Sequence, residues 1–242
     1  MNLLKQDAYN ITPILLTLNA FVGIFYSKLP LQEYVTHIVS IVLIAVILDS
    51  IINYIKLKKW VFSKSGLISG LIIGSVLGPS SLQITVLAPV LAILSKHVIK
   101  WNGVHHFNPA GSGMLLAGLI TPATAWWAGN PLTLLFLYPD YLVKKTQGVI
   151  FLVSWYALQF LTGSPLYQLN YPIIFFALIM AIEPVTTPNN RKAQIVFGIG
   201  LALLVTFLPN ILMALKLPMF DIVLGSLLFM NIFSRFLDSK IR

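Results

Sequence analysis

Apolar residues fall into a series of segments along nearly the whole chain, and short polar stretches separate them. Ten such segments can be counted in the 242 residues. A membrane-crossing helix needs about 20 predominantly apolar residues. The alternation predicts an all-α, polytopic membrane protein rather than a soluble domain with one anchor. The segments are approximately Tyr9–Ser27, Tyr34–Ile55, Ser65–Leu77, Leu82–Ile99, Phe107–Ile120, Asn130–Leu142, Gln147–Leu161, Tyr171–Ile182, Ala193–Leu208 and Pro218–Phe236.

Four of these segments, the third, fifth, sixth and eighth, have only about 12–14 residues. Short apolar segments at membrane depth form half-helices, re-entrant pieces or buried core helices. The third segment ends at Gly78-Pro79, and the eighth ends at Glu183-Pro184. We therefore expect about ten transmembrane or half-membrane helices, some of which stop inside the membrane.

The ten segments divide into two sets of five. Because five is odd, the second set would run through the membrane inverted relative to the first. The short third and eighth segments correspond in this division, as do the fifth and tenth, which both follow a polar stretch with proline. Interrupted segments at corresponding positions of two halves indicate a binding site between inverted repeats. The pattern predicts one membrane domain over residues 1–242, with repeats at about 9–122 and 130–236.

Composition and charge placement support this topology. Hydrophobic residues make up 57% of the chain and charged residues 10%, whereas soluble domains have about 45–50% and about 25%. If every segment crosses, 14 of the 16 basic residues fall on one side, as the positive-inside rule requires, and both termini are cytoplasmic. The net charge of +9 therefore needs no nucleic-acid partner. The absence of cysteine excludes disulfides and thiolate metal sites.

Few polar residues interrupt the apolar segments, and Glu183 is the most prominent. It ends a run of uncharged residues and precedes Pro184. A carboxylate near hydrocarbon should be partnered, protonated or facing a polar cavity; the alternative is a helix-end carboxylate at headgroup level. Thr186 and Thr187 follow, and non-helical backbone at this depth lines a cavity or is buried in protein. This turn is a candidate ligand contact.

A second polar cluster runs from Lys96 to Gly111. Asn108 can cap the following helix, with Pro109 at its first position. Adjacent His105 and His106 suggest metal or haem ligation, but no other histidine pairs with them at helical spacing, and capping or loop packing is favoured. For Asp49, a partnered or cavity-facing charge and an interfacial position stay open. Signatures of serine nucleophiles, P-loops and Rossmann dinucleotide sites are absent, so no catalytic residue is predicted.

These two clusters resemble the signatures of one membrane family. It contains the D subunit of the Rnf electron-transport complex and the B subunit of the sodium-translocating NADH:quinone reductase. The similarity runs from about Ser63 to the end of the chain. Its motifs are His106-Phe107-Asn108-Pro109-Ala110-Gly111, Met180-Ala181-Ile182-Glu183-Pro184-Val185-Thr186-Thr187-Pro188 with Phe197-Gly198-Ile199-Gly200, and Gly225-Ser226-Leu227-Leu228-Phe229-Met230-Asn231.

The resemblance implies a five-plus-five inverted, urea-transporter-like fold in a prokaryotic cytoplasmic (inner) membrane. It also implies a flavin-binding subunit that passes electrons to or from partner redox proteins, and it allows a homo-oligomer. The family's covalent FMN attachment motif has only a faint counterpart, Thr121-Pro122-Ala123-Thr124, so riboflavin or FMN would be bound non-covalently. The implied site residues are Lys96, Asn108, Pro109, Gly111, Glu183, Thr186 and Thr187.

Two other readings stay open from the sequence. The same architecture places a substrate site at the membrane midplane, which suits a transporter or channel for a small polar solute or for a flavin. A structural assembly subunit is the third reading. Electron transfer predicts a redox-active chromophore in the purified protein, whereas transport predicts substrate flux without one.

Overall fold

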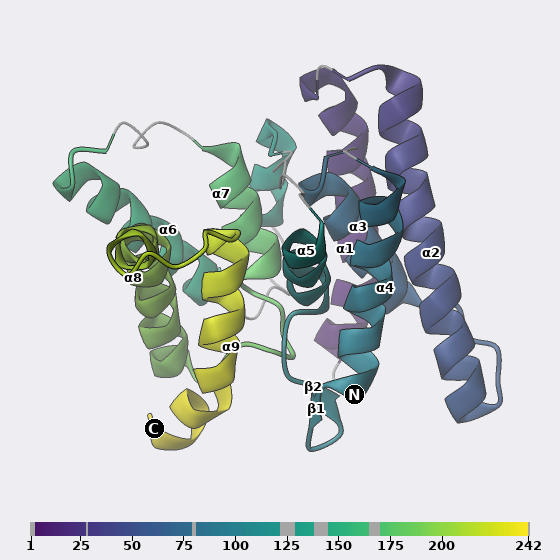
Figure 1. The fold of residues 1–242 in the computed structure, drawn as a ribbon. Coiled ribbons are helices and arrows are strands. Elements are labelled where there is room, and N and C mark those ends of the chain that lie inside the picture. Colours follow the sequence, from purple (N-terminus) through teal and green to yellow (C-terminus); the bar gives the residue numbers. More distant parts are fainter. Residues whose placement is uncertain are drawn as a thin grey trace.

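The computed structural model describes residues 3–27, 29–78, 81–121, 129–137, 145–164 and 170–241. Within these ranges the chain is helical except for turns and one two-stranded antiparallel sheet (Figure 1). The elements are α1 (Leu3–Tyr26), α2 (Leu31–Leu57), α3 (Lys64–Val76), α4 (Leu82–Val98), β1 (Lys100–Trp101), β2 (Val104–His105), α5 (Pro109–Ile120), the 3-10 helix η1 (Pro131–Leu137), α6 (Lys145–Leu161), α7 (Tyr171–Phe175), the π-helix η3 (Phe176–Met180), α8 (Arg191–Ala214) and α9 (Ile222–Lys240).

Three helices in the described part of the chain are long and apolar enough to cross a membrane, namely α2, α8 and α9. Exposed aliphatic side chains such as Ile47 on α2 and Leu203 on α8 cover their outward faces. Aliphatic surface of this kind is favourable against lipid and costly against water. The expectation of an all-α membrane protein is confirmed at this level.

The predicted segments correspond to helical elements, with differences at the short ones. The sixth segment, Asn130–Leu142, contains the 3-10 helix η1, and its last residues lie outside the described ranges. At about 2.0 Å per residue, η1 by itself is too short to cross a bilayer. The eighth segment starts as α7 and widens into η3 before ending at Met180. The polar stretch between α4 and α5 forms the β1–β2 hairpin, which the apolar pattern did not predict.

Polar N-caps explain where most of the helices begin. In each case a side-chain oxygen accepts a hydrogen bond from a backbone N–H two or three residues ahead, which satisfies a donor that the helix leaves free. The capping residues are Ser63 for α3, Ser81 for α4, Asn108 for α5, Asn170 for α7, Asn190 for α8 and Asp221 for α9.

The helices pack into two groups that meet at α5 and α9. In the first group α2 packs against α3 and α4, and α4 packs against α5. In the second, α6 packs against α8 and η3, and α8 packs against α9. Glycines allow the closest approaches: a Cβ at Gly70 of α3 would lie 2.8 Å from the Cα of Val42 on α2. Gly66, Gly70 and Gly74 recur every four residues along α3 and let it pack closely against α2.

A small buried polar cluster joins α1 to η1. The Asn19 side-chain amide donates to Thr133 Oγ1 at 3.0 Å, and the Asn130 amide donates to the Asn19 carbonyl at 2.9 Å. All three side chains are buried. Hydrogen bonds between polar side chains are a common means of holding helices together in lipid. The first helix is therefore tied to a residue 111 positions later.

Candidate functional site

Asn108 stands at the point where the two groups of helices meet. It is buried, and its Oδ1 accepts from the Gly111 N–H at 2.9 Å, while Pro109 occupies the first turn of α5. The predicted cap is thereby confirmed. A proline suits this position because its missing N–H has no partner in the first turn of a helix.

Asn108 also forms hydrogen bonds with two elements of the second group, α9 and η3. Its backbone N–H donates to Asn231 Oδ1 of α9 at 3.1 Å, and its Nδ2 donates to the Met180 carbonyl at 3.2 Å. Asn231 Nδ2 in turn donates to the Thr186 carbonyl at 3.1 Å. We call Asn108, Asn231, Thr186 and the Met180 carbonyl the polar junction. It fastens α5, α9 and the end of η3 together.

The turn after η3 is organised by hydroxyl groups. Thr187 Oγ1 donates to the Glu183 carbonyl at 2.7 Å, and Thr186 Oγ1 donates to the Glu183 carboxylate. Both threonines are buried, whereas Glu183 is only partly so. Proline at 184 cannot donate a backbone hydrogen bond. In this non-helical stretch the Thr187 hydroxyl supplies the donor for the Glu183 carbonyl.

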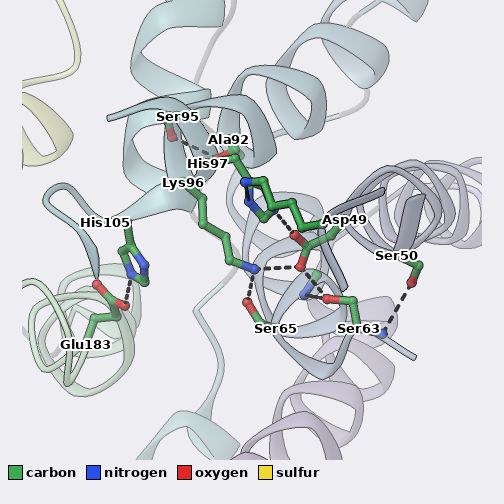
Figure 2. A network of polar contacts seen from close by, with 12 residues as sticks. Asp49, Ser50, Ser63, Ser65, Ala92, Ser95, Lys96, His97, His105 and Glu183 are labelled. Carbon is green, nitrogen blue, oxygen red and sulfur yellow. Dashed lines mark hydrogen bonds and ion pairs between the residues drawn. The ribbon is translucent and has the colours of Figure 1, made fainter. Parts of the chain in front are cut away.

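Glu183 also pairs with His105, from the β1–β2 hairpin of the first group. His105 Nε2 donates to Glu183 Oε1 at 2.9 Å, as Figure 2 shows. The two side chains are 15% and 21% exposed. This contact is thus at the edge of the junction, where water can reach it.

A second network surrounds Asp49 of α2, and its side chain is completely buried. Asp49 accepts hydrogen bonds from the Ser63 hydroxyl, from Lys96 Nζ at 2.6 Å and from His97 Nε2 at 2.5 Å (Figure 2). Lys96 Nζ also donates to Ser65 Oγ at 2.5 Å. We call these five residues the Asp49 network. It connects the C-terminal ends of α2 and α4 with the start of α3, and of the two placements left open for Asp49, the partnered one is found.

The structure therefore divides the residues predicted for the site into two places. Asn108, Pro109 and Gly111 at the start of α5 lie against the turn that carries Glu183, Thr186 and Thr187. Lys96 belongs to the Asp49 network instead. The short stretch from α4 through β1 and β2 links the two places, since it carries both Lys96 and His105.

Several buried polar atoms among the described residues have no hydrogen-bond partner. Ser112 Oγ on α5 and Ser226 Oγ on α9 belong to the two helices that meet at the junction, and Gln147 Oε1 belongs to a side chain whose amide donates to the Ala181 carbonyl. His106 Nδ1 is the fourth such atom near the junction. Burial, together with the charge of Arg235, holds the pKa of His106 below its usual value of 6.5. Unpaired buried polar atoms are uncommon and call for an explanation.

Two cavities lie away from the junction. One, of about 570 Å³, is bordered by the N-terminal parts of α2 and α4, including Glu33 and His37. The other, of about 440 Å³, lies among α6, α7 and α8 and is bordered by Gln159, Asn170 and Thr206. Both volumes fall in the range of small-molecule sites. Within the described ranges no group of three or more His, Asp or Glu side chains gathers as a metal-ligand set.

Sequence reasoning missed three of the residues that build these networks. His97 was not singled out, His105 was considered only for metal or loop packing, and Asn231 was noted only as part of a motif. Asn231 does carry a signal, because an amide in the apolar run of α9 needs a buried partner. Thr124, the second residue considered for flavin attachment, lies outside the described residues.

The chain matches no protein-family model, and no curated protein matches it.

Proposed function

We propose that this protein is a membrane-embedded, flavin-binding electron-transfer subunit that works with partner redox proteins. The proposal begins from the motif resemblance to the Rnf D and sodium-translocating reductase B subunits. One observation carries it: the two motifs, separated by about 70 residues, meet in space. Asn108 binds the Met180 carbonyl 72 positions away, and His105 binds Glu183 across 78 positions.

The packing supports a five-plus-five inverted repeat. If α1 to α5 correspond in order to η1, α6, α7–η3, α8 and α9, equivalent pairs pack in both sets. The contact between α2 and α3 corresponds to the contact between α6 and η3. The contact between α2 and α4 corresponds to that between α6 and α8, and the contact between α4 and α5 to that between α8 and α9. The N-caps of α3, α4 and α5 likewise match those of α7, α8 and α9.

The inverted repeat makes a topological prediction. Figure 1 marks both termini along the lower edge of the molecule, the N-terminus beside the β1–β2 hairpin and the C-terminus at the end of α9. Single-cysteine labelling of intact cells with a membrane-impermeant reagent, at Ser239 and in the Lys58–Lys59 turn, should find both positions on the cytoplasmic side. Accessibility of one of them from outside would contradict this topology.

The polar groups at the junction fit a flavin in donor and acceptor type. An isoalloxazine ring presents carbonyl acceptors and an N–H donor along one edge, and the unpaired Ser112, Ser226 and Gln147 atoms offer complementary partners. Glu183 and His105 would hold the exposed edge of the ring. A bound flavin supplies the electron transfer itself, while these residues bind it, orient it and set its polarity.

The first experiment is the visible absorption spectrum of detergent-purified protein, before and after acid precipitation. Non-covalent flavin should give bands that move to the supernatant. Bands that stay with the pellet would show covalent attachment, with Thr121 and Thr124 as the first residues to replace. Protein that purifies colourless and gains no bands with added riboflavin or FMN would overturn the proposal.

The second candidate function is transport of a small polar solute. The cavity of about 440 Å³ among α6, α7 and α8 favours it, because amide and hydroxyl side chains border it. Uncharged hydrogen-bonding groups suit a neutral polar molecule better than an ion. Solute flux into liposomes reconstituted with colourless protein would support transport, and its absence would leave this cavity without a transport role.

A further inference from the structure

Four exposed lysines gather where α2 ends and the hairpin begins. Lys56 lies in the last turn of α2, Lys58 and Lys59 follow it, and Lys100 starts β1. Lys56 Nζ lies 2.9 Å from His97 Nδ1. Lys56 is also close enough to Lys100 for the two positive charges to repel each other. We call these four lysines, with Trp60 and Phe62, the basic corner.

The nearest carboxylate cannot neutralise this corner. Asp49 is buried, and its oxygens already bind Ser63, Lys96 and His97. No ion pair within the described residues involves any of the four lysines. The C-terminus of α2 adds only about half a negative charge. The basic corner therefore keeps a surplus of several positive charges that face outwards.

Aromatic side chains accompany these lysines. Trp60 is 70% exposed and stacks on Tyr54 at 4.7 Å, and Phe62 is also exposed. Tryptophan and tyrosine are enriched at the level of lipid headgroups. An indole that is mostly uncovered by its own protein is typical of a residue at that level.

The lipid-facing side of α2 leads directly to the basic corner. Leu43, Ile47, Ile51 and Ile55 are all exposed and recur every four residues, so they form one apolar stripe along the helix. A stripe of this length can accompany an acyl chain, and it ends at Lys56. The apolar stripe, the Trp60 ring and the lysines therefore lie along α2 and the turn after it in the same order as the acyl chain, the glycerol region and the phosphate of a phospholipid.

We propose that the basic corner binds the headgroup of an anionic phospholipid, with an acyl chain along the stripe on α2. A free anion would need the lysines but not the stripe, and an acidic partner protein would need neither the stripe nor the exposed Trp60. This site is independent of the flavin and of the polar junction. The uncompensated positive charges of the four lysines would serve to bind this lipid headgroup.

The test measures quenching of Trp60 fluorescence by brominated lipids in vesicles that contain the full chain. The Trp60 emission is obtained by subtracting the emission spectrum of the Trp60→Phe variant, which changes only an exposed side chain. Brominated phosphatidylglycerol is compared with brominated phosphatidylcholine at equal mole fractions. We expect phosphatidylglycerol to quench at a several-fold lower mole fraction. Each lysine near an anionic surface contributes at most about fivefold in affinity, so the Lys56→Gln/Lys59→Gln variant should be quenched by the two lipids at nearly equal mole fractions.

The matched control is Arg191→Gln/Lys192→Gln, which removes the same charge at the start of α8. It should leave the preference at Trp60 unchanged. Equal quenching by both lipids in the wild type would overturn the proposal, as would a preference that survives in the double lysine variant. Loss of the preference in millimolar inorganic phosphate, but not in chloride of equal ionic strength, would replace the lipid by a free anion.

Discussion

Asp49 and Glu183 are two carboxylates in similar helical surroundings, but they differ in burial and in hydrogen-bond partners. Asp49 is completely buried and accepts from a lysine, a histidine and a serine. Glu183 is partly exposed and has one histidine and one threonine as side-chain partners. Asp49 binds groups of its own helical group, whereas Glu183 binds a hairpin of the other group.

The difference separates a structural charge from an accessible one. A buried carboxylate surrounded by donors has a fixed environment, and removing it leaves its cationic partner without compensation. A carboxylate at an edge can exchange its partner for water or ligand at small cost. We therefore expect substitutions at Asp49 to change stability and substitutions at Glu183 to change binding.

The largest effect is expected for Asp49→Asn. The change leaves Lys96 in a half-buried site without its counter-charge, and breaking a buried pair costs about 3–5 kcal/mol. Thermal unfolding in detergent, followed by circular dichroism, measures it. Lys59→Gln is the control, since Lys59 is exposed and has no hydrogen bond to the Asp49 network. A loss below about 1 kcal/mol for Asp49→Asn would show that the network is not structural.

Asn231→Ala tests whether the polar junction is structural as well. It leaves the Asn108 N–H and the Thr186 carbonyl without partners, and each unsatisfied buried group costs about 1–3 kcal/mol. We expect a loss of about 2–3 kcal/mol in the same unfolding assay. Asn210→Ala, at an exposed position of α8, should change stability much less. Equal losses for the two variants would argue against a special role for the junction.

Glu183→Gln should separate the two carboxylates most clearly. Glutamine keeps the size and one acceptor oxygen, so we expect a stability change under about 1 kcal/mol. Flavin affinity, measured by fluorescence titration of the apoprotein, should fall about tenfold through loss of a charge-assisted contact of about 1.5 kcal/mol. If Glu183→Gln unfolds the protein as readily as Asp49→Asn does, the contrast between the two sites is wrong.

The smallest effect concerns pH. Burial and Arg235 lower the pKa of His106 in the folded protein, so the unfolded chain binds more protons near pH 6.5. Stability should therefore decrease as the pH falls through that value, with a shallow slope. His106→Gln should have a flatter profile between pH 7.5 and 5.5. An identical slope in both proteins would assign the pH dependence to other groups.

The sequence predicted those parts of the site that break a local pattern. Asn108 with Pro109, and Glu183 with Pro184, interrupt apolar runs, and both interruptions lie at the junction. The partners were not predictable because packing between distant segments chooses them. Nothing in the sequence around His97 indicates that its ring meets Asp49, 48 residues earlier.

The same limit applies to the fold. Apolar length located the helices well, since lipid requires long continuous apolar segments. It could not distinguish a 3-10 helix such as η1 from an α-helix, nor foresee the widening of the chain into η3. Such changes of helical pitch depend on neighbours, and the hairpin at residues 100–105 carries too few residues for a periodic signal.

The hydrogen bonds between Asn19 and Asn130 have a consequence for how the protein is made. A ribosome adds about 5–20 residues per second, so the 111 residues between the two asparagines take roughly 5–20 s to synthesise. Until residues 130–133 follow, the side-chain amide of Asn19 lacks its native partners. During that time α1 can already pack against α3, but its buried amide is hydrogen-bonded as in the folded protein only when η1 has been made.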